Sequence, residues 1–501
     1  MELLRPLTGL PPLGNGYSGI GAFGCIARNG TQYHDSDTLG EWVLTHDGET
    51  KAKRGLWAKA SEMAAMAPPE RNRWVDFLRA MSILAVVIGH WLVAAPYVDD
   101  QGAVQGGHLL GILPWSQWLT WAFQVMPIFF LVGGYSNGVS WSAGLRKAEH
   151  GQTGVYRDWF ASRVQRLITP VFPVLLLWAG LAFAMTLAGM DRANVRMATE
   201  LALIPVWFLA VYLLVTALTP LSMRAWKRFG FGSFASLVLA AIAVDWLTLA
   251  RDVPYLNFIN FLFVWVGIHQ LGYAWKDGAF AKVPVALAWF AAALAVLVGM
   301  TVYGPYPIAM IGVPGAEITN SMPPTIALFA LGVMQAGLVL ALEPIGRKML
   351  DNAALWTATV LMNGMIMTVY LWHLTAFVLV MVVAWIAGGI GLDMFPGTAA
   401  WWWSRPIWFA LYMAALLPMI GLFARHERVF LPIRGGRTVP KLRVVFGVLA
   451  ICIGLAMTAA ISIASPEGLT GVRIWVVALP FVGAGLLGFG PVYGWFGKKV
   501  Q

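Results

Sequence analysis

Long apolar stretches separated by polar segments dominate the chain from about residue 75 onward. A bilayer core about 30 Å thick needs roughly 20 mostly apolar residues per helix. Twelve stretches come close to this length, and none shows the polar–apolar alternation of a barrel strand. They are 75–96, 117–139, 167–189, 202–222, 233–250, 255–275, 283–303, 324–343, 355–387, 406–424, 442–464 and 473–496. The pattern predicts an all-α polytopic membrane protein with about twelve transmembrane helices.

Two of the stretches are unusual in length. The stretch 233–250 is short and includes Asp245, whereas the stretch 355–387 is long enough to tilt or to extend beyond the bilayer.

The composition agrees with the pattern, because 59% of the residues are hydrophobic and only 12% are charged, compared with about 25% charged in soluble domains. This composition excludes a disordered or fibrous protein and disfavours a soluble multidomain enzyme.

The basic residues predict the orientation of the chain. With the N-terminus in the cytoplasm, 29 of the 34 Lys and Arg residues fall in cytoplasmic segments. Cytoplasmic loops normally carry such an excess, so we expect a multi-pass protein of the cytoplasmic (inner or plasma) membrane with both termini cytoplasmic. The formal net charge of +10 then needs no nucleic acid partner. Residues 1–70 lack the layout of a secretory signal and are expected to form a poorly ordered cytoplasmic leader.

The first span carries three candidate functional residues. Ten residues separate Arg79 from His90, which places both side chains on nearly the same helix face, about 16 Å apart along the axis. Asp76 shares that face. An ordinary interfacial ion pair explains Asp76 and Arg79 equally well. His90 favours a function, because an ionisable group at membrane depth is costly and normally faces a cavity or a partner.

Two further motifs lie near the second and third spans. Arg163 and Arg166 are three residues apart ahead of Pro170, so their guanidinium groups are neighbours on a helix and suit phosphates. A simple cytoplasmic anchor explains them as well. In 129–135 (Phe-Phe-Leu-Val-Gly-Gly-Tyr) the paired glycines permit close approach of a ligand, although small residues in membrane helices mostly serve packing.

The ninth span contains Tyr370 and His373, which share a helix face at mid-membrane depth. Other buried polar residues are expected to make hydrogen bonds between helices rather than a site; they are Asp245, Asn363, Gln124, Gln335 and His269.

In their order, these motifs resemble the membrane acyltransferase family 3. Typical of that family are an Arg and a His with ten residues between them, a Phe-Phe-x-x-Ser-Gly-Phe/Tyr type segment, an Arg-x-x-Arg pair and a late Tyr-x-x-His segment. The sequence departs at Gly133, where the family often has serine. The resemblance covers 71–425, which would form a ten-helix acyltransferase core, followed by a cytoplasmic loop and two additional transmembrane helices in 426–501.

The resemblance implies transfer of an acyl group, usually acetyl, from acetyl-CoA or another acyl-CoA to a hydroxyl of a sugar-containing envelope acceptor such as a polysaccharide or glycolipid. His90 would act as general base or transient acyl carrier, supported by Arg79 and Asp76. Arg163, Arg166 and Arg73 are expected to bind the donor. Residues expected against the substrate or behind these groups are Tyr370, His373, Phe130, Gly134 and Tyr135. No metal is expected.

Two other classes of function stay open on the sequence alone. A secondary transporter also has about twelve helices and cytoplasmic termini, but such carriers usually show two related halves, which are not evident here. A flippase or non-catalytic scaffold for envelope synthesis is the other alternative. The acceptor-side loops are short and do not identify the acceptor.

Overall fold

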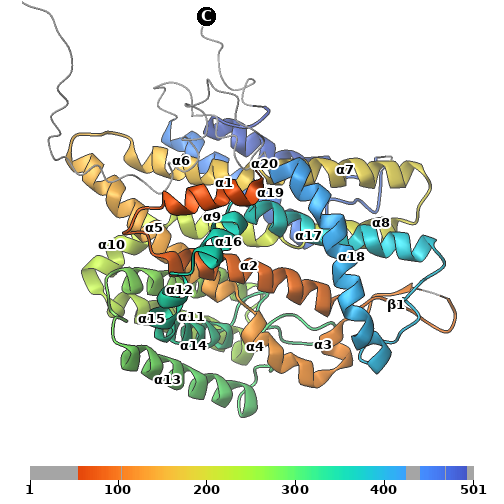
Figure 1. Ribbon diagram of the computed structural model, residues 1–501, viewed down its shortest axis with the longest axis horizontal. Helices are drawn as coiled ribbons and strands as arrows, with labels where there is room; N and C mark the ends of the chain where they lie inside the picture. The colour runs from red at the N-terminus through yellow and green to blue at the C-terminus, as the bar shows by residue number, and fades with distance from the viewer. Residues whose placement is uncertain (1–54, 103, 425–439, 469, 493–501) are drawn as a thin grey trace, which may run out of the picture.

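The computed structural model describes residues 55–102, 104–424, 440–468 and 470–492. Almost all regular structure in these ranges is helical (Figure 1). The first helices are α1 Leu56–Ala65, α2 Arg73–Val93, α3 Leu109–Ile112, α4 Thr120–Phe123, α5 Met126–Glu149, α6 Val155–Ile168, α7 Val171–Leu187, α8 Arg192–Leu203, α9 Val206–Ala217 and α10 Thr219–Phe229. The later helices are α11 Phe231–Arg251, α12 Asn260–Lys276, α13 Val283–Val302, α14 Ile326–Ala341, α15 Glu343–Met349, α16 Ala353–Asn363, α17 Ile366–Ile386, α18 Ala399–Phe423, α19 Lys441–Ile461 and α20 Ile474–Leu487. Two 3-10 helices, η1 Pro114–Leu119 and η2 Leu256–Ile259, and one antiparallel pair, β1 Tyr97–Val98 with β2 Val104–Gln105, complete the set.

The structure confirms the all-α membrane class. Within the described ranges, eight helices are long and apolar enough to cross a membrane, or ten if each of two bent pairs forms one span. The expected number of about twelve is higher. The difference arises because α12 has 17 residues and α20 has 14, so both are shorter than a membrane span, and because α8–α9 and α14–α15 count only if each bent pair forms one span. The stretch 355–387 divides into α16 and α17, of which α17 is the span.

The two bent pairs are α8 with α9 and α14 with α15, which turn by 42° and 52°. Pro205 lies at the first break. Proline has no backbone N–H to donate and clashes with the preceding turn, so a bend at this point follows from the sequence.

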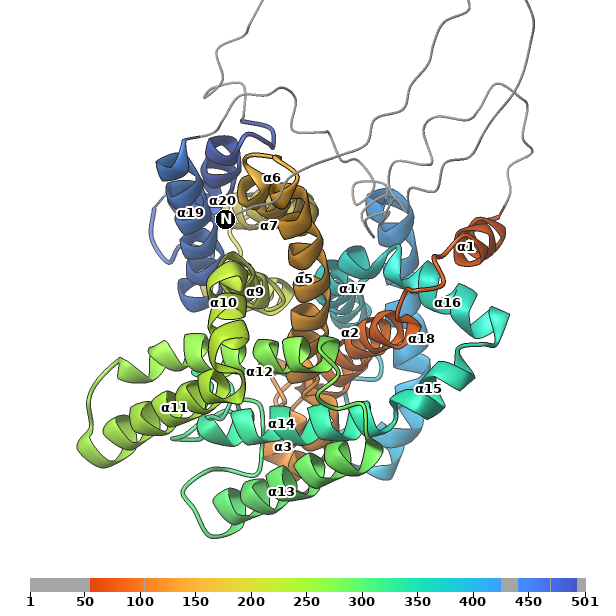
Figure 2. The same ribbon diagram turned by 90° about the vertical axis from the view of Figure 1, so that its left-hand side faces the viewer.

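Helix α5 runs through the centre of the molecule (Figure 2). Its closest neighbour is α12, and glycines make the approach possible. A Cβ at Gly134 would lie 1.9 Å from the carbonyl oxygen of His269, and one at Gly272 would lie 2.3 Å from that of Leu131. The two backbones therefore touch directly, as small residues allow in membrane helices.

Two hydrogen bonds fix the first turn of helix α2. The Asn72 side chain caps it by accepting from the backbone N–H of Trp74, and the indole of Trp74 donates to the carbonyl oxygen of Val339 at 3.0 Å. The helix ends at Val93, where Ala94 becomes extended. His90 consequently lies in the last turn of α2, close to the β1–β2 hairpin that follows.

Part of the N-terminal leader is ordered. Helix α1 packs on α16, where the indole of Trp356 donates to the carbonyl oxygen of Ala64 at 3.0 Å and Ala60 is buried. The expectation of a poorly ordered leader is therefore wrong for 56–65, because small residues one turn apart let this helix seat closely. Residues 1–54 lie outside the described part of the chain.

The two C-terminal helices pack against each other, α19 also packs against α9, and α20 packs against α6 and α7 (Figure 2). A Cβ at Gly483 would lie 2.5 Å from the carbonyl oxygen of Gly447, so α19 and α20 also meet at backbone distance. Helix α20 ends earlier than the stretch 473–496 indicates, because Gly488 takes a positive φ of 95°. The loop expected within 426–439 lies outside the described residues.

Buried polar residues join helices, as expected. The amide of Gln335 donates to the carbonyl oxygens of Trp121 and Gln124, both at 3.0 Å. Asp245 accepts from Asn260 at 2.7 Å and from the hydroxyl of Tyr306 at 2.9 Å. Burial, followed by the nearby carboxylate, raises the pKa of Tyr306, so its hydroxyl stays a donor to Asp245.

Candidate active site

His90 on α2 and His373 on α17 form a hydrogen-bonded pair. Nδ1 of His90 lies 2.9 Å from Nε2 of His373, and the two ring planes differ by 16°. Nδ1 of His373 lies 2.7 Å from the carbonyl oxygen of Tyr370. A carbonyl oxygen can only accept, so Nδ1 of His373 carries the proton, and Nε2 of a neutral ring is then an acceptor. His90 therefore donates from Nδ1, which leaves the lone pair on its Nε2.

The surroundings of the pair differ on its two sides. His373 is fully buried, and the indole of Trp91 donates to its carbonyl oxygen at 3.1 Å. His90 is half-buried, and no residue in the described ranges makes a hydrogen bond with its Nε2. The arrangement presents one imidazole nitrogen as a base, held in a defined tautomer by a buried partner.

Tyr370 lies one turn from His373 but its hydroxyl points elsewhere. It donates to the carbonyl oxygen of Pro205 at 2.8 Å, and the residue is almost fully buried. Pro205 is the N-cap of α9 and lies at the α8–α9 break. The structure thus gives the hydroxyl of Tyr370 a bond that secures the bent pair, and its hydrogen does not face the two imidazoles.

At the other end of α2, Asp76 holds two arginines. Its carboxylate is buried and lies 2.6 Å from Nε of Arg71 and 3.2 Å from Nη1 of Arg79. Nη2 of Arg79 donates to the hydroxyl of Ser136 on α5 at 2.9 Å. The expected pairing of Asp76 with Arg79 is present, and Arg71 joins it. With Asp76 and Ser136 as partners, the guanidinium of Arg79 has little freedom to turn.

Arg163 on α6 is held by the same face of α5. Its Nε donates to Oδ1 of Asn137 at 3.1 Å, its Nη2 donates to the hydroxyl of Ser140 at 2.5 Å, and its guanidinium stacks over the ring of Trp159. Asn137 also bonds with Nε2 of His269 at 3.2 Å, which ties this group to α12. Arg166, one turn further along α6, is exposed.

The structure brings the arginines of α2 and α6 together. Arg79 interacts electrostatically with Arg166, and the phenol of Tyr212 on α9 interacts with Arg79, Arg163 and Arg166. Along α2, this cluster and His90 are separated by about 16 Å, the rise of eleven helical residues. The candidate site therefore has two parts, an arginine cluster and an imidazole pair, joined by one helix.

Other residues expected at the site have different neighbours. Nη1 of Arg73 donates to the carbonyl oxygen of Leu350 at 2.9 Å, and its guanidinium lies over Trp356. Phe130 is fully buried and stacks on Trp265, and Tyr135 packs on Trp275. Gly134 contacts α12, as described above. These contacts explain Phe130, Gly134 and Tyr135 by packing, and a part of Arg73 in donor binding stays a prediction.

Sequence reasoning missed the polar partners on α5 and the phenol on α9. Ser136, Asn137 and Ser140 are three and four residues apart and therefore share a face, a signal that could have been read from the sequence. Tyr212 sits in an apolar run without a motif, so nothing in the sequence distinguishes it from a packing residue.

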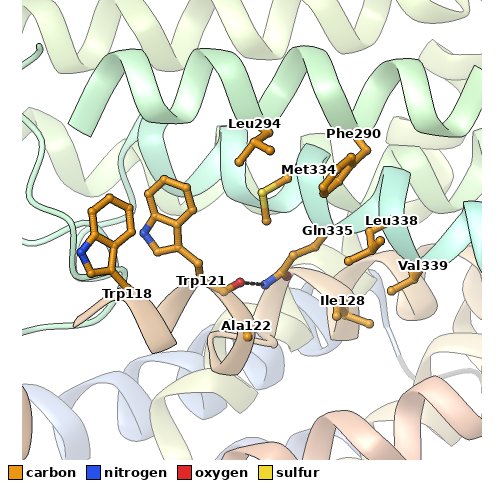
Figure 3. Close-up of a pocket in the computed structure, with 10 residues that line it drawn as sticks. All are labelled: Trp118, Trp121, Ala122, Ile128, Phe290, Leu294, Met334, Gln335, Leu338 and Val339. Atoms are coloured by element: carbon orange, nitrogen blue, oxygen red, sulfur yellow. Dashed lines mark hydrogen bonds between the residues drawn. The ribbon is translucent and has the colours of Figure 1, made fainter. Parts of the chain in front are cut away.

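A separate apolar groove of about 390 Å³ lies between α13, α14 and the η1–α4 segment, with Ile128 of α5 also lining it (Figure 3). Leu294 and Phe290 line it from α13, Met334 and Leu338 from α14. Gln335 points across the floor to the carbonyl oxygen of Trp121. The groove contains neither imidazole of the pair and none of the clustered arginines.

The comparisons with known proteins agree with the motif order. A family model described as an acyltransferase domain, that of the acyltransferase 3 family, matches residues 72–425. Comparisons with curated proteins and with solved structures find no match. The matched range contains α2 to α18 and with them both parts of the candidate site. The resemblance read from the motifs is confirmed: the chain belongs to the acyltransferase 3 family of membrane acyltransferases.

Proposed function

We propose that this protein is an O-acyltransferase. It moves an acyl group, acetyl in the simplest case, from cytoplasmic acyl-CoA to a hydroxyl of a sugar-containing acceptor of the cell envelope, a polysaccharide or a glycolipid. The observation that carries the proposal is the His90–His373 hydrogen bond, which leaves Nε2 of His90 as a base. Family membership favours acyl transfer over a secondary transporter, a flippase or a scaffold.

In the proposed reaction, Nε2 of His90 accepts the proton of the acceptor hydroxyl as its oxygen attacks the thioester carbonyl carbon. The new C–O bond forms, the C–S bond breaks, and the CoA sulfur leaves with the proton that His90 had taken. His373 accepts from Nδ1 of His90 throughout and supports the transient imidazolium. No acyl-histidine is needed for this sequence of steps.

The donor is assigned to the arginine cluster. Arg79, Arg163 and Arg166 offer several guanidinium groups in one region, and guanidinium groups bind phosphate oxygens in pairs. The pantetheine arm would then cover the roughly 16 Å along α2 to His90. With the N-terminus in the cytoplasm of an inner or plasma membrane, the cluster faces the cytoplasmic acyl-CoA pool and the His90 end of α2 faces the acceptor.

The test is acyl transfer by the full chain in nanodiscs, with labelled acetyl-CoA and an envelope glycolipid extract as acceptor. We expect His90→Ala to abolish transfer while CoA binding persists. Arg166→Ala should weaken CoA binding, whereas Arg157→Ala, on the same helix but paired with the exposed Asp158, should not. If the wild type neither binds acyl-CoA nor transfers an acyl group from it, then acyl-CoA is not the donor and the proposal is wrong.

A further inference from the structure

Tyr212 lies where α9 faces α5, and aromatic rings fix its orientation. Its ring centroid is 5.5 Å from those of Phe129 and Phe208 and 5.7 Å from that of Phe130. Three aromatic neighbours leave the ring little rotational freedom. The hydroxyl is therefore directed by packing rather than by its own hydrogen bonds alone.

The hydroxyl points over Gly133. A Cβ on Gly133 would lie 2.8 Å from both Oη and Cε2 of Tyr212 and 3.2 Å from Cζ. These distances are too short for a side chain, so the phenol occupies the space that any larger residue at 133 would need. Glycine at this position and tyrosine at 212 thus form a matched pair, and the pair places a hydroxyl beside α5.

That position borders the arginine cluster. Ser136 and Asn137 are three and four residues beyond Gly133 and so lie on the same face of α5. Ser136 holds Arg79 and Asn137 holds Arg163. Tyr212 is half-buried, and its phenol lies within electrostatic range of Arg79, Arg163 and Arg166. A phenol among guanidinium groups can add one directed donor to an anion that they attract.

We propose that Tyr212 is a positioning residue of the donor site: its hydroxyl donates a hydrogen bond to a phosphate oxygen of the nucleotide part of acyl-CoA, which the arginine cluster holds. The inference rests on the proposed function and deepens it. It explains why a large polar residue interrupts the apolar α9 and why the facing position is glycine. Like the arginines it joins, Tyr212 acts on the phosphates and not at the thioester.

The test compares two donors with and without phosphates, acetyl-CoA and S-acetyl-N-acetylcysteamine, in transfer by the full chain. Tyr212→Phe keeps the ring and its contacts and removes only the hydroxyl. We expect KM for acetyl-CoA to rise about ten- to hundredfold, as for loss of a hydrogen bond to a charged group. The kinetics with the phosphate-free thioester should not change. Tyr303→Phe, whose ring is 88% exposed, is the control and should leave both donors unaffected.

Three results would overturn the inference. An equal loss of activity with both donors would mean that Tyr212 only supports the fold. In that case the unfolding temperature of the variant would also fall. An unchanged KM for acetyl-CoA would show that the hydroxyl of Tyr212 does not contact the donor. If instead Tyr212→Phe weakens retention of phosphatidylglycerol and leaves acetyl-CoA unaffected, the phosphate belongs to a lipid headgroup. Failure of the wild type to bind acyl-CoA is a different outcome and rejects the proposed function itself.

Discussion

Nδ1 of His90 lies 2.9 Å from Nε2 of His373, although 283 residues separate them in the sequence. The carbonyl oxygen of Tyr370 fixes the proton of His373 on Nδ1, and that in turn fixes the proton of His90. A backbone atom of α17 thereby determines which nitrogen of α2 is basic. This relationship leads directly to a prediction about His373.

Replacement of His373 by leucine removes the acceptor for Nδ1 of His90, so the imidazole loses its fixed tautomer. We expect kcat to fall about ten- to hundredfold with little change in KM for the donor. His373→Gln, whose amide oxygen can accept the same bond, should recover part of the rate. His150→Gln, at the exposed end of α5, is the control. A change in donor KM without a change in kcat would contradict the role given to His373.

Asp76→Asn tests whether the carboxylate orients Arg79 or only balances its charge. If it orients the guanidinium, the substitution should raise KM for acetyl-CoA and lower the unfolding temperature, because Arg71 and Arg79 lose a buried partner. If it only balances charge, the cluster becomes more positive and the affinity for CoA should increase. We expect the first result. Glu200→Gln breaks an exposed pair with Arg196 and should change neither quantity.

Tyr370→Phe removes the hydrogen bond to Pro205 and keeps the ring. We expect the free energy of unfolding to fall by about 1 kcal/mol, measured as a lower unfolding temperature, and kcat to stay nearly the same. A loss in kcat of about 10²–10³-fold is the usual cost of removing an oxyanion donor. Such a loss would instead show that the hydroxyl of Tyr370 takes part in the reaction.

Gly134→Ala should destabilise the protein strongly. The new methyl group would lie 1.9 Å from the carbonyl oxygen of His269, so α5 and α12 must move apart and overpacking typically costs about 1–3 kcal/mol. Gly180→Ala introduces the same methyl group on α7, where nothing lies within 4 Å, and is the matched control. Similar unfolding temperatures for the two variants would show that the crossing is not tight.

The sequence was most informative where chemistry is local. Arg79 and His90 share a helix face because of their spacing, and Asp76 pairs with Arg79 because three residues bring them to adjacent positions. It was least informative about breaks in helices. Nothing in the apolar run 355–387 fixed its division into α16 and α17, since hydropathy measures apolar content and not backbone continuity. Gly134 could likewise be read as a ligand contact or a packing contact until α12 was placed against it.

Alone, the sequence determined the membrane class, the family and the helix face that carries Arg79 and His90, because hydropathy and helical periodicity act over neighbouring residues. The tertiary structure decided which distant residues complete the site. The packing of α17 decides which nitrogen of His90 carries the proton, and the packing of α5 and α9 assembles the arginine cluster. The ring of Tyr212 explains why residue 133 is a glycine. Such contacts join residues far apart in the chain, and they follow from how helices pack rather than from any local pattern.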